Sequence, residues 1–157
     1  MTKPVITYFP ARGRAEIFRL VLVAAGVEWE ENTVGGDDLA KLKASGTLPF
    51  GQLPVYEDEN IRLAQSITIA RYLARKYGFF GKTIEVFQSF FWRSLPTVTL
   101  QEGALIDQIL DGLTDYTNKW VPLMFPQLNK EGMKAFISET APVWLGFFEK
   151  LVAKVHS

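Results

Sequence analysis

A β-hairpin that leads directly into a helix is the feature of this sequence that most limits how the chain can fold. Two short apolar runs, residues 53–56 and 61–64, flank the turn-forming triplet Asp58-Glu59-Asn60. This pattern predicts two antiparallel strands joined by a tight turn. A helical pattern follows at once, with an apolar face made of Ile67, Ile69, Ala70, Leu73 and Ala74. One short piece of chain therefore predicts a strand edge and a helix start close together.

This strand edge and helix start together predict a binding site. Ser66 is a candidate N-cap of the helix, because a serine hydroxyl can accept a hydrogen bond from an unpaired amide of the first turn. The same amides and the helix dipole favour a bound carboxylate. Pro54 stands at the head of the first strand, where proline is tolerated at an edge or in a special turn. These features favour an extended, acidic, peptide-like ligand added along the edge.

The residues before the hairpin predict a small α/β domain. A β-rich segment at 4–9 is followed by a helical pattern at 14–25 and a second β-rich segment at 27–34. Such a strand–helix–strand unit implies parallel strands joined by a right-handed crossover. With a short helix at 39–44 and the hairpin, the order is β-α-β-α-β-β-α, which predicts a thioredoxin-like domain over residues 1–82.

The second half predicts an incomplete all-α domain over residues 100–157. Helical periodicity extends over 100–125, with a kink expected at Pro122, and over 129–155, with a kink expected at Pro142. Two long helices need a further surface to cover, so we expect this domain to be partial.

The side chains that the chain lacks exclude several kinds of chemistry. Its 157 residues contain no cysteine and one histidine, His156, next to the last residue. Thiol–disulfide exchange is therefore excluded, as are the usual histidine-based triads and metal clusters. Lys+Arg and Asp+Glu both number 17, and this balance argues against nucleic-acid and membrane partners. Without a signal-peptide pattern or a long apolar run, we expect a cytoplasmic protein.

Four short motifs follow one another along the chain: Thr7-Tyr8-Phe9, Arg12-Gly13-Arg14-Ala15-Glu16, Leu48-Pro49-Phe50-Gly51-Gln52-Leu53-Pro54 and Gln65-Ser66. In this order they resemble the cytosolic glutathione transferases, closest to the sigma class with pi-like features. The resemblance covers residues 3–82 and resumes over 100–125. It implies a homodimeric enzyme that joins the thiol of glutathione to small apolar electrophiles, with glutathione as co-substrate and neither a cofactor nor a metal.

The resemblance implies a catalytic role for two residues. Tyr8 would donate its hydroxyl proton to the glutathione sulfur and so stabilise the thiolate, and Arg14 would add positive charge beside that sulfur. The thiolate needs such stabilisation because an ordinary thiol has a pKa of about 8.5. The structural alternatives are a strand-end tyrosine of the core and an arginine on a helix surface.

Five residues around the hairpin are implied to bind the glutathione backbone and its γ-glutamyl end. Leu53 would pair its backbone with the cysteinyl moiety, and a cis Pro54 would present that edge. Gln65 and Ser66 would hold the γ-glutamyl carboxylate, and Gln52 would contact the tripeptide backbone. For Ser66 the alternative is a plain N-cap, and for Gln52 it is an exposed turn residue.

The other implied contacts lie further from the hairpin. Lys43 would pair with the glycyl carboxylate, although a tryptophan common in the family before that lysine is missing here; a solvated helix lysine is the alternative. Asp115 would reach across the dimer to the γ-glutamyl amine, and a surface charge is its alternative. Phe50 resembles the aromatic key that some classes insert into the partner subunit, and ordinary core packing is its alternative.

The pocket for the second, apolar substrate would be lined by Phe9, Pro10 and Phe125. For an aromatic residue at such spacing, core packing is the alternative.

Two departures from the family keep a second function open. Residues 83–99 form an atypical apolar linker or insert, crowded with aromatic side chains, which could be a loop over the pocket or an in-frame remnant of unspliced message. The chain also ends near the second long helix, so we expect a C-terminally truncated member of the family. The alternative function is therefore a non-catalytic protein that binds glutathione or an apolar ligand, or a structural protein derived from the family.

Overall fold

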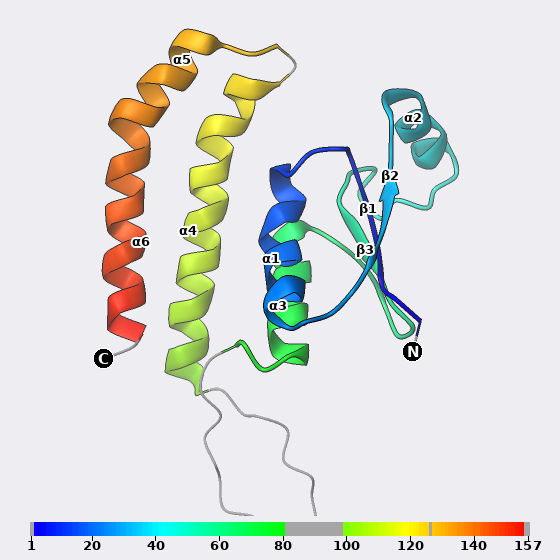
Figure 1. Ribbon diagram of the computed structural model, residues 1–157, viewed down its shortest axis with the longest axis horizontal. Helices are drawn as coiled ribbons and strands as arrows, with labels where there is room; N and C mark the ends of the chain where they lie inside the picture. Colours follow the sequence, from blue (N-terminus) through cyan, green and yellow to red (C-terminus); the bar gives the residue numbers. More distant parts are fainter. Residues whose placement is uncertain (1, 81–98, 126, 156–157) are drawn as a thin grey trace, which may run out of the picture. The chain divides into compact units, whose positions relative to one another are not determined.

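Figure 1 shows the computed structural model, which describes residues 2–80, 99–125 and 127–155. The chain divides into two compact units, Met1–Phe80 and Gly81–Ser157. Most of the atypical apolar segment, residues 83–98, lies outside the described residues, as does His156. In the part of the chain that is described, no helix has both the length and the apolar character needed to cross a membrane.

A four-stranded mixed sheet in the order β2-β1-β3-β4 is the frame of the first unit. The strands are β1 (Val5–Tyr8), β2 (Glu30–Thr33), β3 (Val55–Glu57) and β4 (Arg62–Ala64). β1 pairs in parallel with β2 and antiparallel with β3, and β3 pairs antiparallel with β4. The expected crossover unit and hairpin are therefore both present. β2 is shorter than predicted because the N–H of Val27 bonds instead to the carbonyl of Leu22 at the end of the preceding helix.

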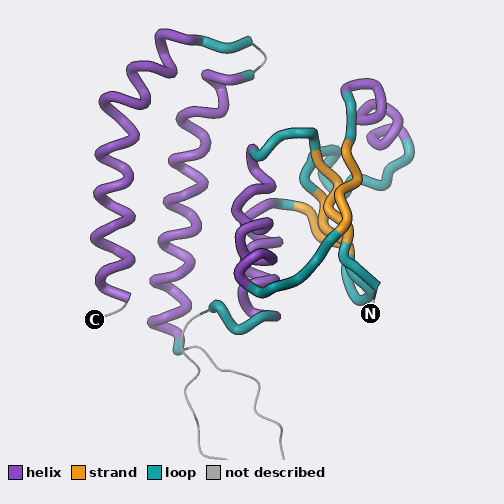
Figure 2. The backbone as a smooth tube through the Cα atoms, viewed as in Figure 1, coloured by secondary structure: helices purple, strands orange, loops and turns teal. Residues whose placement is uncertain are grey.

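Three helices complete this unit: α1 (Glu16–Ala24), α2 (Gly36–Ala44) and α3 (Ser66–Lys76). A 3-10 turn, η1 (Gly13–Ala15), leads into α1. In Figures 1 and 2, α1 and α3 lie side by side against the sheet, while α2 stands apart from them near the end of β2. The first unit therefore has the thioredoxin-like fold that the order of elements predicted.

The alternation of side chains along the strands divides the core of the first unit into two clusters. The larger cluster contains buried residues from β1, β3, η1, α1 and α3: Ile6, Tyr8, Ala15, Phe18, Leu22, Tyr56, Ile69, Ala70 and Leu73. A smaller cluster contains Leu48, Val55 and Ala64, against which Leu39 and Leu42 of α2 pack. Full burial of one large apolar side chain contributes about 1.5–3 kcal/mol, so the larger cluster supplies most of the packing energy of this unit.

A buried carboxylate ties the hairpin turn to α3. The Asp58 side chain is 5% exposed. Its oxygens accept five hydrogen bonds, from the hydroxyls of Tyr56 (2.9 Å) and Tyr72 (3.0 Å), from Lys76 Nζ (2.7 Å), and from the backbone N–H groups of Asn60 (2.9 Å) and Ile61 (3.1 Å). Burial alone would raise the pKa of the Asp58 carboxyl, but the donors around it hold that pKa well below its ordinary value.

The second unit is helical, with α4 (Leu100–Met124), α5 (Lys130–Ala135) and α6 (Ala141–Val155). Thr99 begins α4 through a capping box with Glu102, in which each side chain accepts a hydrogen bond from the other residue's backbone N–H. Tyr116 of α4 makes ring contacts with Phe136 and with Trp144 and Phe148 of α6, at centroid distances of 5.4–6.1 Å. This aromatic cluster joins the helices of the unit.

The chain accommodates the two prolines in different ways. α4 continues through Pro122 and ends two residues later, at Met124. In the second long helix the α-helical pattern is interrupted before Pro142, by a π-helical segment, Phe136–Thr140, in which the N–H of Ala141 bonds to the carbonyl of Phe136. Proline has no N–H with which to bond the carbonyl four residues earlier in an α-helix. The wider π turn changes the hydrogen-bond pattern in the residues just before Pro142.

Candidate functional site

A cavity of about 340 Å³ opens on the first unit. Its lining residues are Phe9, Arg14, Leu39, Lys43, Gly51, Gln52, Leu53, Pro54, Ala64, Gln65 and Ser66. The cavity thus brings together all the residues predicted to bind glutathione except Tyr8 and Asp115, and it includes Phe9 from the predicted apolar pocket. Leu39, Gly51 and Ala64 were not predicted.

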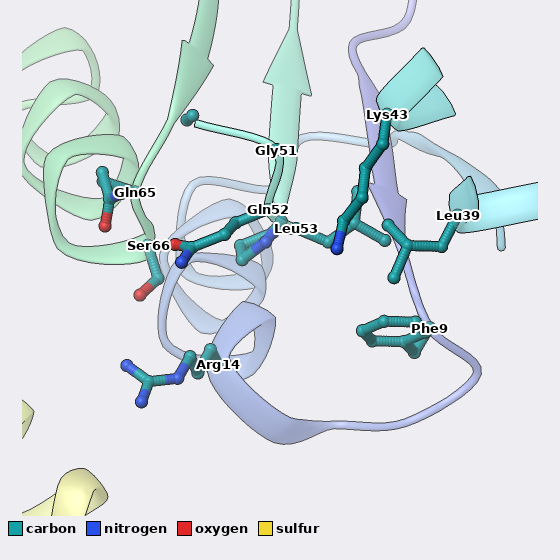
Figure 3. Close-up of a pocket in the computed structure, with 11 residues that line it drawn as sticks. Phe9, Arg14, Leu39, Lys43, Gly51, Gln52, Leu53, Gln65 and Ser66 are labelled. Atoms are coloured by element: carbon teal, nitrogen blue, oxygen red, sulfur yellow. The ribbon is translucent and has the colours of Figure 1, made fainter. Parts of the chain in front are cut away.

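The cavity is long and carries positive charge. Figure 3 shows Gln65 and Ser66 towards one end and Lys43 towards the other, with Gln52 and Leu53 between them. Arg14 and Lys43 are the cations of this lining, and none of the described residues that form it is acidic. Such a lining favours an extended ligand with negative charge.

The hairpin supplies the middle of the cavity. The peptide bond between Leu53 and Pro54 is cis, as the resemblance implied. Pro54 is buried directly before β3, and Leu53 is half-buried on the cavity side. The turn that precedes β3 therefore lines the cavity.

The start of α3 supplies one end. Gln65 has φ 71° and ψ 109°, a conformation that is rare for a residue with a side chain. Ser66 is the first residue of α3, and the N-cap is Gln65, which makes no side-chain capping bond, so the prediction that Ser66 is the N-cap is wrong. The positive φ turns the chain abruptly into the helix, so Gln65 and Ser66 both line the cavity. Strained backbone of this kind tends to occur at functional sites.

Helix α2 supplies the other end through Leu39 and Lys43. They are four residues apart, so they lie on the same helix face. α2 begins at Gly36, three residues before the predicted start, and this extra turn brings Leu39 inside the helix. The spacing of Leu39 and Lys43 is the signal from which Leu39 could have been found.

Tyr8 lies at the end of β1 and is 7% exposed. It is not part of the cavity lining, although Phe9 and Arg14 are. Its hydroxyl accepts a hydrogen bond of 2.9 Å from the backbone N–H of Arg14. Within the described residues no hydrogen bond is found in which this hydroxyl is the donor.

Gly13 has a role that the sequence analysis missed. Its φ is +43°, and a Cβ placed on it would lie 2.6 Å from the Tyr8 hydroxyl oxygen. Gly13 therefore permits both the turn and the close approach of Tyr8 to the Arg14 amide. The sequence motif that contains Gly13 carried no sign of this contact.

The remaining predicted residues lie outside the cavity lining. Pro10 is exposed in the loop after β1. Phe50 is 65% exposed next to Gly51, and so is not packed in the core. Asp115 and Phe125 belong to the second unit, where both are exposed. No group of three or more metal-ligating side chains was found among the residues that the structure describes.

Comparison with known proteins agrees with this fold. The first unit is a thioredoxin-like domain, and the second unit is helical. The family model for the glutathione S-transferase N-terminal domain matches residues 4–75, within the first unit. The crystal structure of the glutathione S-transferase from Ascaris lumbricoides has a TM-score of 0.70 and 33% identity, over 98% of this chain and 69% of that one. The chain therefore belongs to the glutathione S-transferase family.

Two further relatives bear on the class within the family. Glutathione S-transferase alpha-2 of Rattus norvegicus is 38% identical over 157 residues, which cover 98% of this chain and 63% of the relative. A nu-class enzyme from Haemonchus contortus has a TM-score of 0.62 and 36% identity, over 83% of this chain and 56% of that one. The sigma-like class with pi-like features is not supported by the curated relatives, which carry alpha-class names. The chain spans about 63% of the length of the curated relatives it matches.

Proposed function

We propose that this chain is a glutathione transferase that joins the thiol of glutathione to small apolar electrophiles. The observation that carries the proposal is the cavity itself, in which Arg14, Lys43, Gln52 and Gln65 surround the cis Leu53–Pro54 edge. A tripeptide with a carboxylate at each end suits a long cavity with a helix start at one end and a lysine at the other.

In this proposal each part of the cavity binds one part of glutathione. Gln65 and Ser66 hold the γ-glutamyl carboxylate at the first turn of α3, where the N–H groups have no partner within the helix. The Leu53 backbone pairs with the cysteinyl moiety and Gln52 with the tripeptide backbone. Lys43 pairs with the glycyl carboxylate at the end opposite α3.

Tyr8 and Arg14 act on the sulfur in the proposed reaction. The Arg14 amide occupies one acceptor position of the Tyr8 hydroxyl, and the hydroxyl proton is then donated to the thiolate. The charge of the Arg14 side chain favours the same anion. The stabilised thiolate attacks the electrophile and forms a carbon–sulfur bond. In an addition the π electron pair moves to the neighbouring atom, which takes up a proton; in a substitution the leaving group departs with the electron pair of the broken bond, and the thiol proton passes to solvent.

The proposal extends to residues outside the described cavity. The enzyme is a cytoplasmic homodimer in which Asp115 of the partner contacts the γ-glutamyl amine and Phe50, exposed on the first unit, contacts the partner. Phe9, Pro10 and Phe125 line the pocket for the apolar electrophile. No cofactor or metal takes part in the reaction.

The test compares the wild-type chain with Tyr8→Phe in binding and in turnover. We expect both to bind immobilised glutathione, and we expect Tyr8→Phe to conjugate a general apolar electrophile about 10- to 100-fold more slowly, because a hydrogen bond to a charged group contributes about 1.5–3 kcal/mol. Equal rates in the two proteins would contradict the role of Tyr8. Failure of the wild type to bind glutathione would contradict the proposed function as a whole.

A second function is favoured by one observation. Tyr8 is buried and absent from the cavity lining, as expected for a strand-end tyrosine of the core. A protein that retains glutathione or an apolar ligand without turnover would bind in the same test and give no conjugation in the wild type.

A further inference from the structure

One arginine outside the cavity holds the turn that carries the Arg14 amide. Arg19 lies on α1, and its side chain is 15% exposed. Its Nη1 donates to the backbone carbonyls of Ala11 (3.0 Å) and Arg12 (3.3 Å). These two carbonyls directly precede Gly13 and Arg14, so Arg19 fixes the path of the chain into η1.

The other nitrogens of Arg19 are anchored in the sheet. Nε and Nη2 form a two-pronged pair with the carboxylate of Glu31, at 2.7 and 3.0 Å. Glu31 belongs to β2 and also accepts a 2.7 Å hydrogen bond from Trp29 Nε1. A planar guanidinium can make these contacts in two directions at once, whereas an ammonium cannot hold the same geometry.

The same guanidinium lies next to Tyr8. Its central carbon is 5.8 Å from the centroid of the Tyr8 ring, within the range of a cation–π contact. A continuous path therefore leads from Glu31 to Tyr8. Glu31 binds Arg19, and Arg19 binds the carbonyls of residues 11 and 12. The chain then runs through Gly13 to Arg14, whose N–H donates to the Tyr8 hydroxyl at 2.9 Å.

We propose that Arg19 is a positioning residue for the Tyr8 hydroxyl. Arg19 is not part of the cavity lining; it fixes residues 11–14 so that the Arg14 amide occupies one side of the hydroxyl oxygen and leaves the proton for the bound thiol. This inference rests on the proposed glutathione transferase function, because it assigns Arg19 to that reaction.

The test uses Arg19→Lys, which keeps the charge and loses the fork, with Lys76→Met as the matched control. Lys76 belongs to a partly buried ion pair with Asp58 in the same unit, away from the turn at 11–14. Both substitutions weaken an ion pair, but only Arg19→Lys releases the turn. Rates are measured per folded molecule in the full chain.

We expect Arg19→Lys to lower kcat roughly 10- to 100-fold, the size of effect that follows a small misplacement of a reacting group. The KM for glutathione should stay within about twofold, since the cavity residues are intact. The pH midpoint for formation of the bound thiolate, followed by its ultraviolet absorbance, should rise by about one unit. Lys76→Met should change neither the midpoint nor the rate per folded molecule.

A purely structural role gives a different result. Arg19→Lys would then lose activity only in proportion to its folded fraction, with an unchanged midpoint, and that would overturn the proposal. An equal shift of the midpoint in Lys76→Met would overturn it too.

A second measurement does not depend on activity. Hydrogen exchange at the Arg14 amide, resolved by NMR, should become about tenfold faster relative to the α3 amides in Arg19→Lys, since about 1.4 kcal/mol of lost local stability corresponds to a factor of ten. Unchanged relative protection of that amide would contradict the positioning role even if the wild type shows no conjugation. If the wild type shows no conjugation but hydrogen exchange at the Arg14 amide becomes faster in Arg19→Lys as expected, the proposed function is contradicted and the positioning role of Arg19 is not.

Discussion

The hydroxyl of Tyr8 takes its hydrogen bond from a backbone amide, and this arrangement restricts the residue next to that amide. The donor is the N–H of Arg14, and the neighbour is Gly13, where a Cβ would lie 2.6 Å from the hydroxyl oxygen. Real Cβ atoms do not approach an oxygen so closely, so any side chain at this position must displace either Tyr8 or the turn. The chemistry proposed for Tyr8 therefore depends on a residue that has no side chain.

Gly13→Ala should reduce conjugation without removing the glutathione cavity. The control is Gly26→Ala, because Gly26 also has a positive φ, +65°, but a Cβ added there would have nothing within 4 Å. Both variants carry the backbone cost of a left-handed alanine, about 1–2 kcal/mol, in urea unfolding. Only Gly13→Ala should lose conjugation per folded molecule, by about tenfold or more. Equal activity in the two variants would show that the contact with Tyr8 has no catalytic consequence.

At the scale of elements, Asp58 explains how a hairpin of two three-residue strands stays attached to α3. One carboxylate accepts hydrogen bonds from the turn backbone and from side chains on β3 and α3. The Lys76 ammonium beside it compensates its charge at 2.7 Å. The hairpin carries Leu53 and Pro54 at one end and leads to Gln65 at the other, so this network contributes to the stability of the unit that carries the cavity.

Asp58→Asn should destabilise the first unit by about 2–4 kcal/mol in urea unfolding, since it removes the charged partner of a buried network. The contribution of Asp58 also depends on pH. Because the folded-state pKa is below the unfolded one, the stabilisation is fully present above the unfolded value and is lost as pH falls towards the folded value. The wild type should therefore lose stability on acidification more steeply than Asp58→Asn.

The exposed pair of Asp38 with Lys41 on α2 provides the control for that experiment. Asp38→Asn removes a carboxylate from an ion pair in water, where such pairs contribute little. It should leave both the unfolding midpoint and its acid dependence nearly unchanged. An Asp58→Asn variant that behaves in the same way would contradict the role of the network.

The local sequence pattern predicted which helices and strands form in the first unit, but it predicted the residues at which they begin and end less well. The hairpin triplet, the apolar face of α3 and the strand–helix–strand order are properties of neighbouring residues, so they can be identified from the sequence. The role of Gln65 as N-cap could not be predicted, because Ser66 has the side chain that usually caps a helix and the positive φ of Gln65 is imposed by the surrounding fold. The π segment before Pro142 was likewise missed, since a missing N–H can be accommodated by a kink or by a wider turn.

At the scale of the whole molecule, the cavity belongs to the first unit, because every residue that lines it lies there. The two core clusters described above also lie in this unit. The predicted cavity residues could be found because the family motifs fall in this unit. Asp58 and Arg19 were missed for a different reason: their contacts join residues up to 18 positions apart in the chain, and only the fold brings them together.

Glutathione should therefore protect the two units unequally. At about 100 times its Kd, a ligand that binds only the folded state stabilises that state by about 2.7 kcal/mol. We expect hydrogen exchange of the β1 and α3 amides to slow on addition of glutathione, and exchange of the α6 amides to change much less. Equal slowing in α3 and α6 would contradict a cavity confined to the first unit, and no slowing anywhere would contradict glutathione binding.

The confinement of the cavity to residues 9–66 also makes the chain modular. A recombination event in the stretch that joins the units could replace the helical half with another and leave every lining residue in its place. In the proposed transferase, exchange of whole segments could then vary the second substrate, while the residues that line the cavity are inherited unaltered.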